Sequence, residues 1–351
     1  MLLSLPASGV SRQLDGLRPP GDPAEPHTTA SWVRDALDCG LLDLPLPGGG
    51  RSADRFRALS EIARVDLDVA RLAEAHVDAQ AIIAELTGAD QLLSGSEIGS
   101  RSRRLWGVWA ANPPTSPLTA TQSSSGWLID GTKPWCSGAG CCDAALVTAH
   151  TVDGYRLFAV DLHDSSVRPV DGTWPARSMR GCDSRSVAFT ATPASPLGGA
   201  DGYLNRPGFW HGAMGVAAVW LGGALAITDP LWTTARRRQL DHHALAHIGA
   251  IDAVLAAAEA LLARAADLID ADPGNESGDA ELAARQVRAV VESAAVQVVD
   301  RVGRALGAAP LALDAAHAKR VGDLELYLRQ SHAERDLEAA GRLVVEKGGH
   351  R

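Results

Sequence analysis

The 351-residue sequence lacks the segments that would direct it to nucleic acid or into a membrane. Its formal net charge is −9, and no long run of Lys or Arg reverses this balance, which argues against nonspecific nucleic-acid binding. The most hydrophobic stretch, residues 212–227, is shorter than the roughly 18–20 residues of a membrane-spanning helix. The first residues lack the basic segment and long apolar region of a signal peptide. We therefore expect no nucleic-acid partner and no membrane span.

Several common enzyme signatures are also missing. No phosphate-binding P-loop, no G-x-S-x-G elbow and no G-x-G-x-x-G after a strand is present. The five cysteines form an odd number without a zinc-type C-x-x-C pair, so we expect reduced thiols and a cytoplasmic protein. His242, His243 and His247 are close in sequence but lack a flanking scaffold specific for a metal. We predict no metal site.

The residues that are present predict an α+β fold. Hydrophobic residues make up 46% of the chain, enough for a sizeable core in two or three domains. Helical spacing precedes residue 101, short strand-like runs follow it, and helical spacing returns from residue 208. We predict an N-terminal helical domain (1–102), a middle β-barrel or sandwich domain (103–206) and a C-terminal four-helix bundle (207–351). The first expected helix begins at Ser31 and ends at Cys39-Gly40. The other expected helices cover 54–86, 212–228, 244–269, 279–306 (capped by Asp279) and 314–345. The expected strands cover 126–129, 144–149, 155–160 and 187–192.

The most informative stretch is residues 126–150, GWLIDGTKPWCSGAGCCDAALVTAH. Asp130-Gly131 predicts a hairpin turn, because glycine readily supplies the positive φ that a tight reversal needs. Beyond it, Trp135, Ser137 and Gly138 bring an aromatic, a hydroxyl and a flexible residue together, where the chain could pack against something flat. A surface hairpin with a buried tryptophan is the plain alternative.

This stretch resembles the flavin-facing hairpin of acyl-CoA dehydrogenases. The shared pattern is Gly-Thr-Lys-x-Trp-x-Ser-Gly-Ala followed by an apolar strand, and a second similarity is the segment 179–189, MRGCDSRSVAF. The resemblance implies FAD as cofactor, with Trp135 beside the isoalloxazine ring and Ser137 near its reactive nitrogen. It also implies that the architecture is helical domain, β domain and four-helix bundle.

Three further residues correspond to cofactor-binding positions of the family. Trp109 lies where the first β-domain strand runs beside the flavin, although of the usual Thr-Glu-Pro-Gly-x-Gly-Ser-Asp loop only residues 112–114, Asn-Pro-Pro, remain. Arg236 corresponds to an arginine that reaches the flavin pyrophosphate of a neighbouring subunit; a solvated basic patch is the alternative. Gly303 fits a glycine segment that approaches the adenine half of a partner's cofactor, and the nearby Gly307 could equally be a helix C-cap.

The catalytic base is less clearly indicated, because the family's Tyr-Glu-Gly-Thr motif is missing. Aligning from Pro310 without gaps places Glu325 at the base position, whereas aligning on Asp323-x-x-x-Tyr327 places Ser331 there, next to His332. A carboxylate in a dry pocket could have a raised pKa and act as the base. A histidine would suit the monooxygenase branch of the family. Pairing on the helix surface is the alternative for both.

The resemblance implies an FAD-dependent oxidoreductase that carries out α,β-oxidation of an acyl thioester. The expected partners are acyl-CoA or a related small molecule and further copies of the chain, in a homodimer or homotetramer. Two alternatives remain open. The chain could be a flavin-dependent monooxygenase of the same fold, or a non-catalytic partner subunit that has lost the usual base.

Overall fold

The computed structural model describes residues 9–87, 104–111, 117–124 and 126–348. The chain divides into two compact units. The first comprises Met1–Gly16, Leu44–Ala70 and Trp210–Arg351, and the second comprises Leu17–Asp43 and Arg71–Phe209. The three domains with boundaries after residues 102 and 206 remain a prediction.

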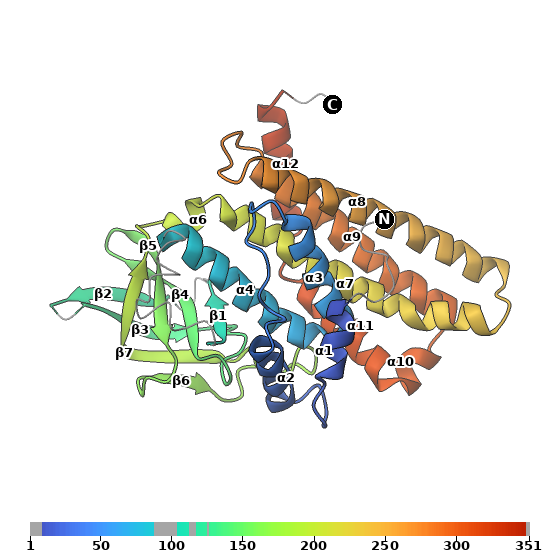
Figure 1. Cartoon of the computed structure of the whole chain (residues 1–351), viewed down its shortest axis with the longest axis horizontal. Helices are drawn as coiled ribbons and strands as arrows, with labels where there is room; N and C mark the ends of the chain where they lie inside the picture. The colour runs from blue at the N-terminus through green and yellow to red at the C-terminus, as the bar shows by residue number, and fades with distance from the viewer. Residues whose placement is uncertain (1–8, 88–103, 112–116, 125, 349–351) are drawn as a thin grey trace. The chain divides into compact units, whose positions relative to one another are not determined.

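The second unit is built on one seven-stranded sheet (Figure 1). The strand order is β1-β4-β2-β3-β7-β5, with β6 added on β7. Strand β5 also pairs with β4 in antiparallel register, which closes the sheet into a small barrel. The strands are β1 (Trp106–Trp109), β2 (Thr119–Ser123), β3 (Gly126–Lys133), β4 (Ala144–Thr151), β5 (Gly154–Asp161), β6 (Val167–Val170) and β7 (Ser186–Leu197).

Strand β4 explains the apolar run at 144–149, because both of its faces are buried. Val147 belongs to the cluster with Trp109, Phe158 and Phe189, whereas Leu146 on the opposite face belongs to a second cluster with Ile82 of α4. Successive side chains of a strand point to opposite faces, so a strand buried on both sides reads as continuously hydrophobic. The four predicted strands are confirmed, each within a longer one.

The predicted hairpin turn at Asp130-Gly131 is wrong. Both residues lie inside β3, which continues to Lys133 and pairs with β7. The register shifts between Ile129 and Gly131, so the glycine marks a bulge. Gly131 has φ +121°, and a Cβ there would lie 3.2 Å from the Pro117 carbonyl oxygen. The glycine therefore serves a close backbone approach within the sheet.

Helices α2 (Pro26–Asp38), the part of α4 (Leu67–Thr87) from Arg71 onward, and α6 (Gly202–Asn205) complete the second unit. The predicted start of the first of these at Ser31 is wrong, because α2 begins with a proline, whose fixed φ suits the first turn of a helix. Its predicted end is confirmed: Cys39 is the C-cap, and Gly40 follows with φ +77°.

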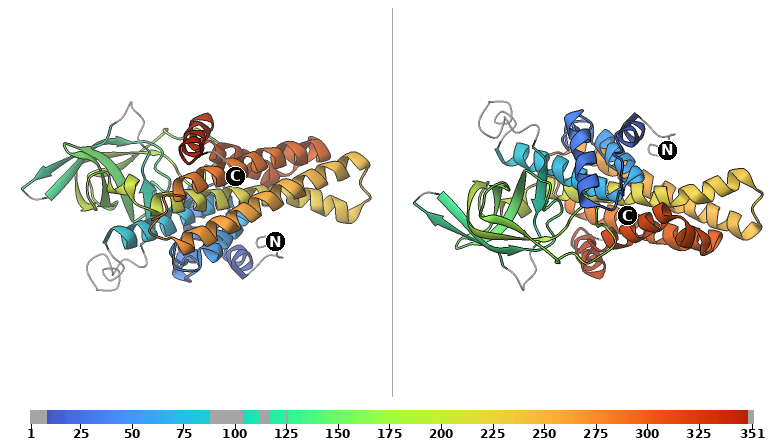
Figure 2. Two further views of the ribbon diagram at one scale, coloured as in Figure 1. Left: turned by 90° about the horizontal axis from the view of Figure 1, so that it is seen from above. Right: turned by 90° about the horizontal axis from the view of Figure 1, so that it is seen from below.

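The first unit is helical, and its three longest helices, α7, α8 and α9, lie side by side (Figure 2). Gly222 of α7 permits a very close crossing with α3, since a Cβ there would lie 2.0 Å from the Ser60 carbonyl oxygen. The helices are α1 (Gly9–Gly16), α3 (Ser52–Val65), the first residues of α4, α7 (Gly208–Arg237), α8 (His242–Ala271), α9 (Ala280–Leu306), α10 (Ala309–Leu313), α11 (Ala315–Leu328) and α12 (Glu334–Glu346).

Two of the predicted long helices are broken. The stretch 54–86 divides at Asp66, which is extended and accepts hydrogen bonds from Asp68 N and Val69 N at the start of α4. The stretch 314–345 divides into α11 and α12 around Ala333, which has φ +45°. The helical spacing of apolar residues in the sequence runs through both breaks, so it does not predict them.

The predicted cap of α9 is correct in position but wrong in detail. Asp279 is the N-cap residue without a side-chain cap bond. The carboxylate of Asp279 instead accepts from Lys347 Nζ, and Asn275 Oδ1 accepts from Ala280 N.

Among the described residues, two helices, α7 and α8, are long and apolar enough to cross a membrane by length and composition alone. The most apolar 18-residue window of α7 is 78% buried, as in core helices that pass the same test. The corresponding window of α8 has a mean hydropathy of 1.7 but is only 28% buried. Helix α8 therefore presents apolar surface that the described part of the chain does not cover.

Candidate functional site

The two segments that carry the family resemblance lie against each other in the second unit. The loop after β3 meets the loop before β7 through three backbone hydrogen bonds: Cys136 N to Arg185 O (3.0 Å), Gly138 N to Cys182 O (2.7 Å) and Ala139 N to Asp183 O (3.2 Å). These bonds fix the loop 135–140 and the loop 179–185 as one paired structure. We call this structure the loop pair.

Backbone strain is concentrated in the loop pair. Trp135, Met179 and Asp183 have φ of +58°, +53° and +44°, values that residues other than glycine rarely adopt. Trp135 is also 58% exposed, although a large indole is normally kept from water. Strained backbone and exposed aromatics both occur preferentially at binding sites. The loop pair is therefore the candidate site of this unit.

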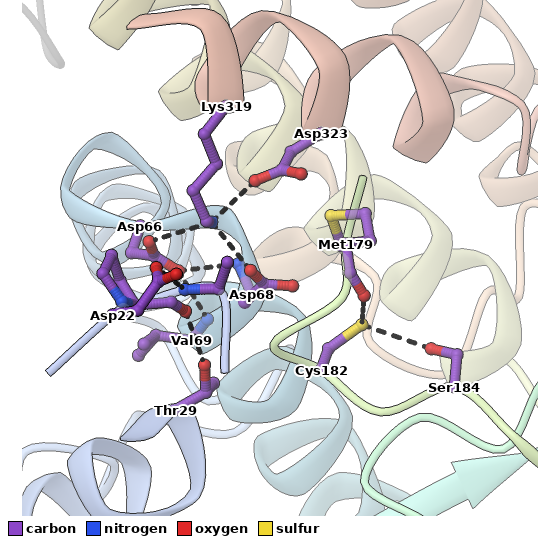
Figure 3. A network of polar contacts seen from close by, with 12 residues as sticks. Asp22, Thr29, Asp66, Asp68, Val69, Met179, Cys182, Ser184, Lys319 and Asp323 are labelled. Atoms are coloured by element: carbon purple, nitrogen blue, oxygen red, sulfur yellow. Dashed lines mark hydrogen bonds and ion pairs between the residues drawn. The ribbon is translucent and has the colours of Figure 1, made fainter. Parts of the chain in front are cut away.

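A chain of buried hydroxyl and thiol groups runs behind Trp135. Ser137 Oγ lies 2.9 Å from Ser184 Oγ. Ser184 Oγ lies 3.2 Å from Cys182 Sγ, and the thiol donates to the Met179 carbonyl oxygen at 3.0 Å (Figure 3). A thiol and a hydroxyl each carry one hydrogen. Because the thiol hydrogen points to Met179, Ser184 must donate to Cys182, and Ser137 must then donate to Ser184. Ser137 Oγ keeps both of its lone pairs and is therefore left as an acceptor.

Trp109 supports the loop pair from the barrel interior. Its indole Nε1 donates to the Ser137 carbonyl oxygen at 3.0 Å, and its ring packs edge-on against Phe189. Only 2% of Trp109 is exposed, which leaves almost no surface to contact a ligand. The structure brings the predicted residues Trp109, Trp135 and Ser137 together, but Trp109 positions the others from behind.

Lys133 is a buried cation next to the loop pair. Its Nζ donates to the Thr148 carbonyl oxygen (2.7 Å) and to Thr148 Oγ1 (2.9 Å), and lies 3.5 Å from the Tyr155 hydroxyl. Burial lowers the pKa of Lys133 to about 8. The amine thereby ties the end of β3 to β4, two residues before Trp135.

The predicted phosphate and adenine contacts lie on helix ends of the first unit. Arg236 is exposed in the last turn of α7, where its guanidinium reaches Thr233 Oγ1 at 3.4 Å. Gly303 lies in the last turn of α9, and a Cβ there would meet no other atom within 4 Å among the described residues. Gly307 is the C-cap with φ +72°, and its N–H donates to the Gly303 carbonyl oxygen at 2.8 Å. The C-cap interpretation of Gly307 is confirmed.

The two predicted catalytic residues are exposed on the first unit. Glu325 lies on the outer face of α11, so this unit does not supply the dry pocket expected of a carboxylate base. His332 follows α11, and its backbone N–H donates to Asp336 Oδ2 at 3.2 Å, while its ring lies 3.8 Å from the same carboxylate. Asp336 is held in turn by Arg285 at 2.8 Å. Both catalytic roles remain predictions.

The sequence reading missed one buried charge cluster in the first unit. Lys319 Nζ contacts Asp66 (3.2 Å), Asp68 (2.7 Å) and Asp323 (2.7 Å) (Figure 3). The Lys319–Asp323 spacing of four was the one available signal. Burial raises the pKa of Asp68 to about 7, with Lys319 opposing and the other two carboxylates adding to the shift. This lysine joins α11 to the start of α4.

Metal ligands do not cluster in the part of the chain that the structure describes. No group of three or more His, Cys, Asp or Glu side chains there could hold a metal ion. His242 and His243 are exposed at the start of α8, with ring centroids 4.0 Å apart. The shortened loop at 112–114 lies outside the described residues.

Comparison with known proteins identifies the fold. No protein-family model and no curated protein matches the sequence. Among solved structures, butyryl-CoA dehydrogenase from Megasphaera elsdenii is 16% identical with a TM-score of 0.78, over 97% of this chain and 100% of that one. The chain has the acyl-CoA dehydrogenase fold.

Two monooxygenases share this acyl-CoA dehydrogenase fold with the chain. TdsC, the dibenzothiophene monooxygenase of Paenibacillus sp. A11-2, in complex with FMN and indole, is 19% identical with a TM-score of 0.80, over 97% of this chain and 96% of that one. Methanesulfinate monooxygenase MsuC from Pseudomonas fluorescens is 19% identical with a TM-score of 0.81, over 98% of each chain. The resemblance first seen in residues 126–150 is confirmed as a likeness of fold.

Proposed function

We propose that this protein is a flavin-dependent oxidoreductase. The observation that carries the proposal is Trp135, an exposed indole held at a strained φ of +58° beside a buried Ser137. A flavin ring needs a flat apolar surface and a polar group for its ring nitrogens, and these two residues supply both. A bound flavin would supply the redox chemistry, accepting a hydride or reacting with oxygen once reduced.

The chain's own residues would bind and orient this cofactor. Trp135 would stack by the ring, and Ser137 would face a ring nitrogen. Trp109 and Lys133 would hold the loop from behind. Arg236 would meet the pyrophosphate of a flavin bound by a neighbouring subunit, because an exposed guanidinium pairs well with a phosphate. Gly303 would allow close approach of a cofactor bound mainly by another copy.

The hydrogen-bond direction in the loop pair favours reduced flavin. Ser137 Oγ is left as an acceptor because its hydrogen is donated toward Ser184. Reduction adds an N–H donor to the flavin ring, whereas the oxidised ring presents only an acceptor at the same place. The hydroxyl would thus match the reduced cofactor. This supports an enzyme that receives reduced FMN or FAD and uses oxygen.

We therefore place a flavin monooxygenase acting on a small molecule ahead of an acyl-CoA dehydrogenase. The exposed His332, oriented by Asp336, could deliver a proton in such a reaction. TdsC and MsuC, which share the fold, are monooxygenases by name. The second candidate is α,β-oxidation of an acyl thioester with bound FAD and Glu325 as base; butyryl-CoA dehydrogenase has the same fold.

A binding titration tests the flavin proposal. Purified protein is titrated anaerobically with FMN and FAD, each oxidised and reduced, while tryptophan fluorescence is followed. From the quenching we expect a reduced flavin to bind at least about tenfold more tightly than the same flavin oxidised. This factor corresponds to one hydrogen bond between uncharged groups that only the reduced flavin forms. Trp135→Leu should remove the quenching, and Trp127→Phe, a half-buried residue of the same barrel, should retain it. Binding of neither redox state would favour the non-catalytic alternative.

A second measurement separates the two reactions. An acyl-CoA added anaerobically to the FAD-loaded protein should leave the visible flavin absorbance unchanged if the protein is a monooxygenase. Bleaching of the flavin that is lost in Glu325→Gln would instead favour the dehydrogenase over the monooxygenase. His332→Asn should lower oxygen-dependent product formation without changing flavin affinity.

We also propose a homodimer or homotetramer. The apolar surface of α8 that the described residues leave uncovered supports this proposal, since contiguous exposed apolar surface marks interaction sites.

A further inference from the structure

A cleft of about 280 Å³ opens between α8, α9 and α12 of the first unit. Apolar side chains form most of its walls, and the polar side chains that line it are Arg264, Asp279, Gln286 and Lys347. Leu261, Leu268 and Leu282 are only half-buried there. Their exposed surface faces an interior that is open to solvent. A small apolar group entering the cleft would remove this surface from water, at about 25 cal/mol per Å². None of the residues assigned above to flavin lines it.

Positive charge is the distinctive feature of the cleft. Arg264 and Lys347 both line it. Lys347 Nζ is held by Asp279 Oδ1 at 2.5 Å and by the Gly278 carbonyl oxygen at 3.2 Å, so its charge is balanced. Arg264 has no hydrogen bond or ion pair with any other described residue. The cleft therefore keeps one uncompensated guanidinium on a protein whose net charge is −9.

We propose that this cleft binds a small aliphatic carboxylate. The chain of the ligand would lie along Leu261, Leu268 and Leu282, and its carboxylate would pair with Arg264. A guanidinium presents parallel N–H donors that match the two oxygens of a carboxylate.

Size and chemistry set the class of ligand. At ~30 Å³ per non-hydrogen atom, the share of one water in the liquid, the cleft holds roughly nine or ten such atoms. Octanoate has this size, whereas a nucleotide or a coenzyme A ester is too large. A cation would meet Arg264 unfavourably, and a neutral alcohol would leave the guanidinium unpaired.

Calorimetric titration of the full-length protein with octanoate tests the proposal. Octan-1-ol serves as the neutral probe of the same length. We expect octanoate to bind about ten- to a hundredfold more tightly, the worth of a hydrogen bond to charged groups. Arg264→Gln should abolish this difference. Arg304→Gln, which changes an exposed arginine of α9 outside the cleft, should preserve it.

A second variant keeps the test independent of the arginine. Ala283→Phe would fill the cleft from α9, and we expect it to weaken octanoate binding at least about tenfold with an unchanged far-ultraviolet spectrum. Equal affinity for octanoate and octan-1-ol in the wild type would overturn the proposal. So would octanoate binding that neither Arg264→Gln nor Ala283→Phe changes, or no binding at all. The flavin titration is expected to give the same result in all three variants.

Discussion

Lys133 shows how one residue can support a site without touching it. The ammonium is buried among neutral acceptors and contacts Thr148 and Tyr155. Hydrogen bonds offset part of the cost of burying this charge, and the rest is seen as the lowered pKa. Lys133 lies two residues before the strained Trp135, which suggests that fixing the end of β3 is worth this cost. The sequence motif contained Lys133, but only the fold shows that it is buried.

The stability of the protein should depend on the ionisation of Lys133. Its pKa is about 8 in the folded state and 10.5 as an ordinary lysine. Between these values the unfolded chain binds more protons, so the free energy of unfolding should rise with pH by up to about 3 kcal/mol. Chemical denaturation at several pH values would measure the difference between wild type and Lys133→Met. The free energy of unfolding of wild type should increase relative to that of Lys133→Met as the pH rises from 8 to 10.5, between the two pKa values of the lysine. A constant difference would contradict it.

Two glycines should respond oppositely to alanine. At Gly138, φ is +78° and a Cβ would lie 2.4 Å from Cys142 Sγ, so Gly138→Ala should destabilise the protein by about 1–3 kcal/mol. At Gly303, inside α9, a Cβ meets nothing among the described residues, so Gly303→Ala should stabilise it by about 0.5–1 kcal/mol. Thermal unfolding would measure both. If Gly303 lets a partner's cofactor approach, the same change should also weaken flavin binding; unchanged binding would remove Gly303 from the site.

Helix ends in the first unit are fixed by charges from distant parts of the chain. Lys319 of α11 neutralises Asp66 and Asp68 at the start of α4 together with Asp323. Removing the cation would leave three buried carboxylates facing one another. Lys319→Met should therefore destabilise the fold by about 3–5 kcal/mol, as measured by urea denaturation. Arg342→Met, at an exposed pair on α12, should leave the free energy of unfolding nearly unchanged.

The same cluster should make the free energy of unfolding depend on pH in the acidic range. The pKa of Asp68 is raised from 3.8 to about 7, first by burial. The folded state then binds more protons than the unfolded chain across that range, so this contribution to stability is lost as pH rises from 4 to 7. Asp68→Asn should lack the slope. A variant with the same pH profile as wild type would show that another group carries the proton.

Elements that depend on local pattern could be predicted, and elements that depend on distant contacts could not. The run 144–149 is apolar because both faces of β4 are buried, which the sequence shows directly. The bulge at Gly131 depends on pairing with β7, which is distant in sequence, and on the Pro117 carbonyl, which belongs to the segment leading into β2. The breaks at Asp66 and Ala333 are likewise stabilised by ion pairs of Lys319 and Arg285. The helical spacing of apolar residues carries no information about such distant contacts.

The candidate site follows the same rule. A motif located Trp135 and Ser137, because a resemblance preserves local spacing. Their partners Ser184 and Cys182 lie about fifty residues later, and only the backbone bonds of the loop pair bring them into contact. Trp109 contacts Ser137 in the structure, and its burial indicates that it supports the loop; its predicted place beside a flavin stays a prediction.

At the scale of the whole molecule, α8 is the element that the single chain leaves incomplete. Its most apolar window is 28% buried, and Leu245 and the alanines at 253, 256 and 257 are exposed. Ala256→Glu should place a charge in an interface between copies and shift the protein to smaller species, with an unchanged melting temperature at low concentration. Sedimentation velocity over a range of concentrations would measure this. Val152→Glu, on the exposed turn after β4, is the control and should leave the assembly intact. If wild type and Ala256→Glu both sediment as single chains, α8 does not join copies of the protein, and its apolar face must serve another partner.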